Sequence, residues 1–515
     1  MVRIMTGKEI FDDDGESADV IVIGAGIGGL SAAAYLAKAG SKVIVLEQDN
    51  HLGGNAAVFR RSGFTFPAGP MSFTAPEYIS ASLRDLGVRG SLVFIRDHFQ
   101  VRRGKLDQVI SLPLPRLAQE LSNNFPGEKQ GIHAVIGVLE EVIAAFDRMH
   151  PEELMEESGT TNEVIECWGN VTARELVNRH LKDPFLRDLL GSQGTSEPEM
   201  SVVLLARMWS FMSKEGIWYT GGGINKVPEL LAGRVRAFGG DIRPGERVEH
   251  ILVQEGRAVG VELTGGARIR SPLVISNADY KETFLKLLPE VPASEKEAVL
   301  RMPLTPSAFS VFMGVKKGSV DLSAFQGDHL LVKLEEGETV PWEDKKPSPE
   351  DFMQDEIWIS WWSRHDPDLA PPGCEALVLK VTAPFDVFAP FDGRSQCYYS
   401  MKEEMADALV GAASKILPGL SRPAIIREVA TPLTYKDWGH RSAGSVAGWS
   451  WRSGDQPETW TRSLTVTSIE GLLMVGVQSF TRLFYGGMGT AMYSGKYAAD
   501  IALGKQYKIS RTKFK

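Results

Sequence analysis

The sequence predicts an α/β protein with three parts: a domain built on a parallel sheet with an antiparallel excursion, a mixed α+β domain, and a largely helical insertion. Three observations lead to this fold class. An apolar run, a glycine-rich turn and an alanine-rich helix follow one another in residues 19–40. Apolar residues recur at three- and four-residue steps between 81 and 215, and short apolar stretches with many aromatic residues alternate between 301 and 455. At 515 residues the chain is long enough for about three domains.

The first domain begins with residues 19–23, Asp-Val-Ile-Val-Ile, which fit a strand buried on both faces. Gly24, Gly26 and Gly29 follow in a GxGxxG pattern, and a helix and a second strand complete a βαβ-type beginning. The first glycine of this pattern allows a tight turn, the second lets the backbone approach a diphosphate, and the third lets helix and strand pack closely. We therefore expect a Rossmann-like dinucleotide-binding domain.

Glu47 ends the second strand. An acid at this distance from the glycine turn can accept hydrogen bonds from the ribose hydroxyls of a dinucleotide. The alternative for the whole pattern is a tight glycine turn without a ligand, and the strand and helix on its two sides favour the dinucleotide.

The remaining chain divides into segments that differ in their pattern of glycine and apolar residues. A three-glycine turn and short strands separated by glycines return in residues 216–300, and a strand, a glycine turn and a helix follow near the end. We expect these parts, in chain order: 1–18, a disordered acidic lead; 19–80, the first part of the nucleotide domain; 81–215, a largely helical cap; 216–300, the second part of the nucleotide domain; 301–455, the substrate-binding domain; 456–504, the third part of the nucleotide domain; and 505–515, a basic tail.

Composition and charge exclude several classes of function. Lysine and arginine number 56 and aspartate and glutamate 65, so the net charge is −9 and no domain-sized basic surface is available for nucleic acid. Cys167, Cys374 and Cys397 form no CxxC pair, which predicts neither a disulfide framework nor a metal site and indicates a reduced, cytoplasmic protein. No signal-peptide pattern begins the chain, and no apolar run approaches the ~20 residues that span a bilayer. We expect no metal ion and no transmembrane helix.

A second glycine pair, Gly53 and Gly54, followed by Asn55, comes shortly after Glu47. The extended pattern resembles that of FAD-binding rather than NAD-binding proteins, and it is similar to the flavin-dependent amine oxidase and phytoene desaturase superfamily. The nearer resemblance is to the branch that contains phytoene desaturases, carotenoid cis–trans isomerases and retinol saturases. Three blocks carry it: 19–55, 220–279 and 471–495.

This resemblance implies a non-covalently bound FAD in the nucleotide domain. In the family the glycine pair brings backbone amides to the diphosphate and ribityl region, the backbone at the position of Val248 meets the adenine, and the last block approaches the isoalloxazine. The residues of this chain that match the cofactor-binding positions are Gly24, Gly26, Gly28, Gly29, Glu47, Gly53, Gly54, Asn55, Val248, Gly476, Gly486, Gly487 and Met488.

The resemblance also implies a reaction. A hydride passes between flavin N5 and a carbon of an extended apolar, isoprenoid- or carotenoid-like substrate, in a desaturase or a saturase, whereas a cis–trans isomerase makes no net redox change. Trp361, Trp362 and the segment 438–460 are candidates to line the substrate tunnel, with ordinary core packing as the alternative. No catalytic residue stands out, and the electron acceptor is open. The basic tail is a candidate for contact with an anionic membrane surface, with a solvated end as the alternative.

Two features depart from the family pattern. Residues 481–483 are additional to the turn that in relatives reads Pro-Gly-Gly-Gly, and Val477 stands where many relatives place an acid for the ribityl hydroxyls. Two other functions therefore stay open: an amine-oxidase-like flavoenzyme on a smaller polar substrate, and a flavin-binding scaffold without turnover, which the altered turn at 485–490 allows. His51, next to the glycine pair, is expected to be a solvent-facing turn residue rather than a catalytic base.

Overall fold

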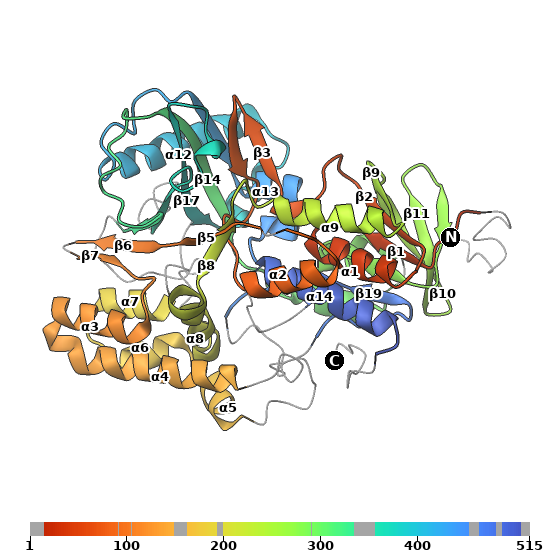
Figure 1. The fold of residues 1–515 in the computed structure, drawn as a ribbon, viewed down its shortest axis with the longest axis horizontal. Helices are drawn as coiled ribbons and strands as arrows, with labels where there is room; N and C mark the ends of the chain where they lie inside the picture. Colours follow the sequence, from red (N-terminus) through yellow and green to blue (C-terminus); the bar gives the residue numbers. More distant parts are fainter. Residues whose placement is uncertain are drawn as a thin grey trace.

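The computed structural model describes residues 15–90, 92–104, 106–148, 162–192, 199–289, 291–333, 356–452, 463–479 and 487–505. Most of the predicted acidic lead, most of the basic tail, the turn residues 480–486 and Trp460 lie outside these ranges. Figure 1 shows the parallel sheet with its helices on one side of the molecule and the mixed sheet and helical bundle on the other.

A five-stranded parallel sheet is the centre of the nucleotide domain, which confirms the predicted fold class. Across the sheet the strands are β19 (Leu472–Met474), β13 (Val274–Ser276), β1 (Val20–Ile23), β2 (Val43–Glu47) and β9 (Asp241–Pro244). Three segments far apart in the sequence thus build one sheet. Each strand runs in the same direction, so their carboxyl ends meet at one edge, where ligands of such sheets bind.

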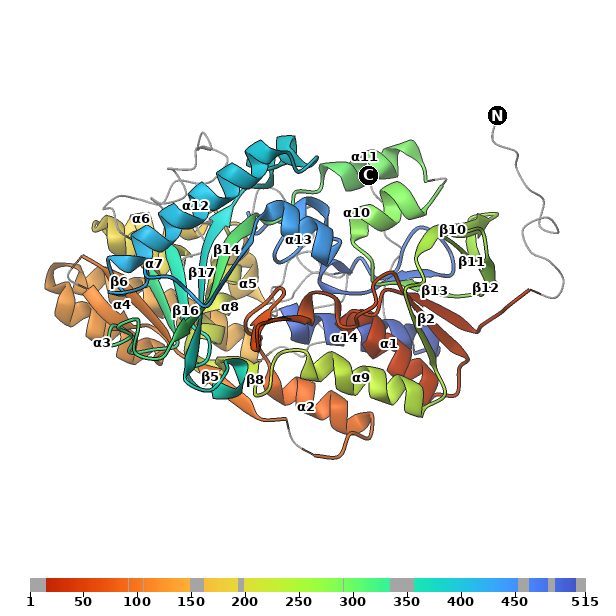
Figure 2. The ribbon, with the colours of Figure 1, turned by 90° about the horizontal axis from the view of Figure 1, so that it is seen from above.

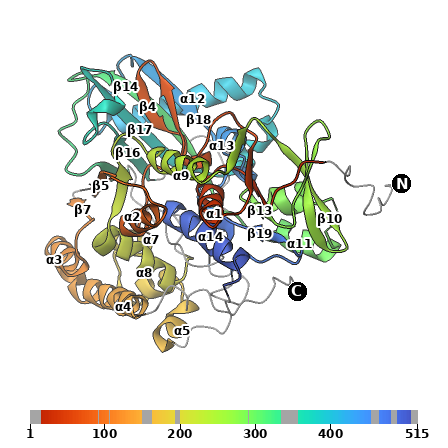
Figure 3. The same ribbon diagram turned by 45° about the vertical axis from the view of Figure 1, so that its right-hand side comes forward.

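Both faces of this sheet are covered. The helices α1 (Ile27–Lys38), α2 (Pro76–Asp85), α9 (Lys226–Ala237) and α14 (Gly487–Ala502) cover one face, with α1 and α14 side by side (Figure 3). The antiparallel strands β10 (Val248–Gln254), β11 (Arg257–Leu263) and β12 (Arg268–Arg270) cover the other, near α10 (Tyr280–Glu282) and α11 (Ala293–Arg301). Val20 and Val22 pack toward the helices and Ile21 and Ile23 toward the antiparallel sheet, which explains the uninterrupted apolar run of β1.

The second sheet has seven strands, which are antiparallel except for one parallel pair, β15 with β6. In order they are β18 (Ile426–Ala430), β14 (Ser307–Lys316), β17 (Cys374–Ala383), β16 (Ile357–Trp361), β15 (His329–Val332), β6 (Phe99–Arg103) and β7 (Leu106–Val109). Figure 2 shows α12 (Gln396–Ser414) lying across this sheet. The hairpin of β3 (Val58–Arg61) and β4 (Phe64–Pro67) packs against it as well, and α13 (Pro432–Gly439) follows β18.

A bundle of six helices has its own apolar core, below the mixed sheet in Figure 1. The helices are α3 (Leu114–Asn124), α4 (Lys129–Asp147), α5 (Glu163–Gly169), α6 (Ala173–His180), α7 (Pro184–Ser192) and α8 (Val202–Ser210). The paired strands β5 (Phe94–Asp97) and β8 (Ile217–Thr220) connect the bundle to the rest of the chain.

The segment predicted as a helical cap, 81–215, differs from that expectation at its beginning. It contains β5, and its strands β6 and β7 complete the mixed sheet. In β6 the apolar residues Phe99 and Val101 alternate with polar residues, which is the two-residue period of a strand. This pattern covers only five residues, and a much longer helical pattern follows it.

Residues 15–18 also differ from the prediction, because they are ordered against the antiparallel sheet rather than part of a disordered lead. The backbone amide of Ala18 donates to the carbonyl oxygen of Arg270 at 2.9 Å, and the carboxylate of Glu16 pairs with Arg243 at 2.5 Å. Within the described ranges, no helix is long and apolar enough to cross a membrane.

Candidate functional site

One cavity of about 1000 Å³ lies at the carboxyl ends of β1, β2, β13 and β19 and extends to the mixed sheet. Most residues predicted from the sequence to bind a cofactor line it: Gly24, Gly26, Gly28, Glu47, Gly53, Gly54, Asn55, Val248, Gly476, Gly487 and Met488. Gly29 lies behind the wall, and Gly486 lies outside the described ranges. The fold therefore brings together residues from all three parts of the nucleotide domain.

The glycine turn after β1 is required by close packing. A Cβ atom added to Gly29 would lie 2.2 Å from the carbonyl oxygen of Gly24, and one added to Gly26 would lie 2.5 Å from Nδ2 of Asn277. Helix α1 begins at Ile27 with no side-chain cap at Gly26. The amides of its first turn therefore have no side-chain acceptor in the wall of the cavity, which is the arrangement that attracts an anion.

Gly28 is held between two other segments that the sequence analysis did not pair with it. A Cβ atom there would lie 2.6 Å from Oδ1 of Asn277 and 2.8 Å from the backbone nitrogen of Gly476. That same nitrogen donates to Oγ of Ser494 in α14 at 2.8 Å. Asn277 lies in one of the three blocks that carry the family resemblance, but it was not among the predicted cofactor-binding residues. Its position just after β13, at the carboxyl edge of the sheet, was the available signal.

Glu47 is 6% exposed, and its carboxylate is fixed by the backbone. Oε2 accepts from the amide of Ala25 at 2.7 Å, and Oε1 accepts from the amide of Asp49 at 3.0 Å. Each oxygen keeps a second lone pair. The carboxylate at the end of β2 can thus accept further hydrogen bonds from hydroxyl groups in the cavity.

The second glycine pair is attached to the first glycine turn. The amide of Gly53 donates to the carbonyl oxygen of Ala25 at 2.9 Å, and Gly53 has a φ of +106° and Gly54 a φ of +55°. A side chain is disfavoured at both positions, because such φ values strain residues other than glycine. The pair brings Asn55 to the cavity wall.

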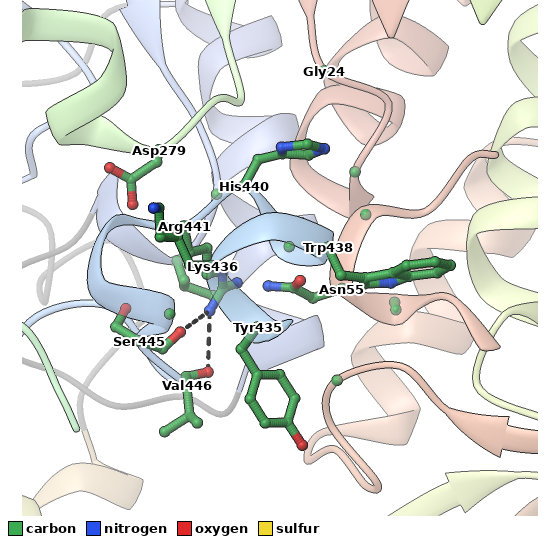
Figure 4. Close-up of a pocket in the computed structure, with 18 of the residues that line it drawn as sticks. Gly24, Asn55, Asp279, Tyr435, Lys436, Trp438, His440, Arg441, Ser445 and Val446 are labelled. Atoms are coloured by element: carbon green, nitrogen blue, oxygen red, sulfur yellow. Dashed lines mark hydrogen bonds between the residues drawn. The ribbon is translucent and has the colours of Figure 1, made fainter. Parts of the chain in front are cut away.

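A segment of the substrate domain crosses the cavity, and it overlaps the stretch 438–460 that the sequence predicts as a lining of the substrate tunnel. We call residues 435–447, from the end of α13 onward, the strap. His440 Nε2 lies 2.9 Å from Oδ2 of Asp49, and the hydroxyl of Ser442 donates to Oδ1 of Asp279 at 2.6 Å. Figure 4 shows Lys436 and Arg441 of the strap between Asp279 and Asn55. The strap therefore joins the first and second parts of the nucleotide domain.

The far end of the cavity is formed mainly by side chains of the mixed sheet. Ala308, Ser310, Phe312, Trp358, Val378 and Lys380 line it from β14, β16 and β17. Tyr435, at the start of the strap, shares a hydrogen bond of 2.8 Å with the Ser310 hydroxyl, and burial raises the pKa of this tyrosine to about 12. This wall is largely apolar, with a few polar groups at fixed positions.

Lys380 is the charged group of that wall. Its Nζ lies 5.3 Å from the centroid of the Trp358 ring, and the two residues are partners across β16 and β17. Burial lowers the pKa of this lysine to about 8, because desolvation disfavours the ammonium form. No acidic side chain of the described ranges forms an ion pair with it. A lysine with such a pKa can gain or release a proton near neutral pH.

The tryptophans predicted to line a tunnel are divided between cavity and core. Trp438 lines the cavity and stacks on His51, with ring centroids 4.8 Å apart. Trp361 and Trp362 pack into apolar clusters instead, in agreement with the alternative of core packing. Trp358, which was not among the predicted tunnel residues, does line the cavity.

The fold and this site define a flavoprotein. Residues 27–503 match the family model of the flavin-containing amine oxidoreductases, and the chain belongs to this family. Its members are flavin-containing oxidoreductases by definition of the family, so the predicted flavin enzyme class and superfamily are confirmed.

The relatives fall in the branch that the sequence resembled. The chain is 28% identical over 532 residues to a chloroplastic prolycopene isomerase of Daucus carota, which covers 95% of this chain and 82% of the relative. It is 26% identical to a lycopene-forming phytoene desaturase of Pseudescherichia vulneris, over 81% of this chain and 86% of the relative. Among solved structures, an oxidoreductase from Methanosarcina mazei superposes with a TM-score of 0.62 at 18% identity, over 93% of this chain and 99% of that one.

Proposed function

We propose that this chain binds FAD non-covalently and acts on carbon–carbon bonds of an extended apolar, carotenoid- or isoprenoid-like substrate. The observation that carries the proposal is the single cavity, which runs from the glycine turn and Glu47 to the apolar wall of the mixed sheet. The names of the relatives, a prolycopene isomerase and a phytoene desaturase, support the substrate class.

The nucleotide end of the cavity fits FAD. The glycines at positions 26 and 28 let the side chain of Asn277 pack against the turn, where a Cβ atom would lie within 2.6 Å of it, and the first turn of α1 offers amides to a diphosphate. Glu47 can accept hydrogen bonds from ribose hydroxyls, and the backbone at Val248 lies in the wall near it. Gly476, Gly487 and Met488 would line the ribityl and isoalloxazine portion.

FAD, when bound, supplies a hydride acceptor or donor. The chain positions an apolar substrate against the walls of Phe312, Trp358 and Val378 and excludes water from it. Desaturation and saturation also move one proton, which Nζ of Lys380 can take up or give. Cis–trans isomerisation moves no net hydrogen, so its overall balance requires no proton from Lys380.

A smaller polar amine is less compatible with the far end of the cavity. The residues that the mixed sheet contributes to its wall include a lysine and, in the described ranges, no aspartate or glutamate. A protonated amine would meet a like charge there, whereas a neutral hydrocarbon would not. The non-catalytic scaffold rested on the turn at 485–490, of which residues 485 and 486 lie outside the described ranges and residues 487–490 begin α14.

Product mass after anaerobic turnover tests the proposal. The purified full-length chain is mixed with carotenoid and isoprenoid substrates, once with oxidised flavin and once with flavin reduced by dithionite, and the products are analysed by mass spectrometry. Loss of two hydrogens identifies a desaturase, gain of two a saturase, and an altered retention time at unchanged mass an isomerase. Turnover of amines together with no change in any polyene would contradict the proposed substrate class.

A further inference from the structure

A half-buried guanidinium lines the cavity. Arg441, in the strap, donates from Nη1 to the carbonyl oxygens of Val446 and Ser445 at 3.0 and 3.4 Å, as the dashed lines in Figure 4 show. With the amide of Asn55 oriented to satisfy its neighbours, Oδ1 accepts from Nε and Nη2 of Arg441 at 2.5 and 3.1 Å. Every hydrogen-bond partner of the guanidinium in the described ranges is therefore a neutral oxygen.

The nearest acid does not neutralise this charge. Asp279 acts on Arg441 only through space. Its Oδ1 is occupied by the hydroxyl of Ser442, and its Oδ2 accepts from Nε2 of Gln478 at 3.0 Å. Burial lowers the pKa of Arg441, because the charged form has lost its water. A half-buried cation whose hydrogen-bond partners are neutral stabilises an anion that enters the same cavity.

The position of Arg441 identifies which anion. Asn55 follows Gly54, and a Cβ atom added to Gly54 would lie 3.4 Å from Cα of Gly26. The Arg441–Asn55 pair therefore lies beside the uncapped N-terminus of α1. His440, the neighbouring residue, bonds to Asp49, two residues after Glu47 on the ribose side. The group with a negative charge between the ribose of the adenosine and the flavin is the diphosphate.

We propose that Arg441 binds the diphosphate of FAD, with Asn55 holding its guanidinium in position. The inference rests on the proposed binding of FAD and adds a contact from the substrate domain. The helix amides meet the diphosphate from the nucleotide domain, and the strap meets it from the opposite side. Substrate domain and cofactor are thereby joined through one charged contact.

Fragments of the cofactor test this assignment. The affinities of ADP, adenosine and riboflavin for the flavin-free full-length chain are measured by calorimetry for the unchanged chain, Arg441→Met and Arg441→Lys. Because a charge-assisted hydrogen bond to the diphosphate is lost, we expect Arg441→Met to reduce the preference for ADP over adenosine about 10- to 100-fold. Arg441→Lys keeps the charge and should lose part of this preference. The affinities for adenosine and riboflavin should not change.

Lys436→Met is the matched control. Lys436 lines the same cavity on the same segment, but its charge is paired with Asp392 at 2.7 Å, so the preference for ADP should be unchanged. Retained adenosine binding in Arg441→Met demonstrates that the site is folded. An unchanged ADP preference in Arg441→Met, or a loss confined to riboflavin, would overturn the assignment. A wild-type chain that binds neither FAD nor ADP would instead contradict the proposed function.

Discussion

The two ends of the cavity differ in whether mainly backbone groups or mainly side chains form the wall. At the nucleotide end the wall is backbone: glycines without room for a Cβ atom, amides of a helix N-terminus, and a carboxylate held by two amides. At the far end the wall is side chains of the mixed sheet and the strap, among them Phe312, Trp358 and Lys380. A backbone wall fixes one cofactor geometry, whereas a side-chain wall can be altered residue by residue while the fold is kept.

The largest effect is expected at the nucleotide end. Gly26→Val would place a branched side chain where an added Cβ atom already lies 2.5 Å from Asn277, and in the space of the diphosphate. We expect protein that contains no flavin, measured by absorbance after purification. Gly137→Val in α4 is the control, because a Cβ atom at Gly137 has no neighbour within 4 Å. Stoichiometric flavin in Gly26→Val would refute the role of the first glycine turn.

At the far end, Lys380→Met should keep the flavin and lower the rate. Removal of a positioned proton-transfer group costs about 10²- to 10⁴-fold in a desaturation or saturation. An isomerisation at constant mass should continue at a rate within a few-fold of the original. Equal losses in redox and isomerisation reactions would show that Lys380 shapes the site rather than moving a proton.

The pH dependence of the reaction rate shows whether Lys380 accepts or donates the proton. The pKa of Lys380 is about 8, so the neutral amine predominates above that pH and the ammonium below it. A desaturase needs the neutral amine to accept a proton, and its rate should rise with pH and level off above about 8. A saturase needs the ammonium, and its rate should fall over the same range. A profile without an inflection near pH 8, or one that persists in Lys380→Met, would contradict this role.

Glu47→Ala should have a smaller effect than Gly26→Val, because it removes hydrogen bonds without filling space. The variant loses the contacts of the carboxylate with the ribose, and we expect FAD to bind about 10- to 100-fold more weakly. Equilibrium dialysis with added FAD measures this loss. An unchanged affinity would mean that the carboxylate serves only the amides of Ala25 and Asp49.

The smallest effect on the site is expected from the basic tail. Deletion of the residues after Gly504 should leave flavin content and turnover unchanged and reduce sedimentation with anionic liposomes, since each basic residue near such a surface contributes about 1 kcal/mol. Neutral liposomes are the control. Unchanged sedimentation with anionic liposomes would contradict the hypothesis that the tail contacts a membrane.

Prediction of the fold from sequence succeeded where one short pattern determines the structure. The run Val20 to Ile23 is apolar throughout because helices cover one face and the antiparallel sheet the other, so a buried parallel strand was the fitting interpretation. The strands β6 and β7 were missed because they are only five and four residues long, and β6 joins the sheet by pairing with β15, more than 200 residues away. Such pairing leaves no local signal.

The same contrast holds within the site. Gly24, Gly26 and Gly53 could be predicted because they stand in short local patterns: Gly24 and Gly53 have positive φ values, and a Cβ atom at Gly26 would lie 2.5 Å from Asn277. Arg441 and Lys380 were missed because their significance comes from burial beside segments distant in the chain. Arg441 lies in the segment 438–460 that the sequence analysis selected for its tryptophans, but neither cation was itself predicted to belong to the site.

The most direct test of a cavity that holds FAD beside an apolar substrate is the absorption spectrum of the purified chain, together with analysis of what it releases on denaturation. We predict a flavin spectrum and free FAD in the supernatant, about one per chain, because the family contains a flavin and we propose that this cavity holds FAD. A colourless protein that also fails to take up added FAD would contradict it.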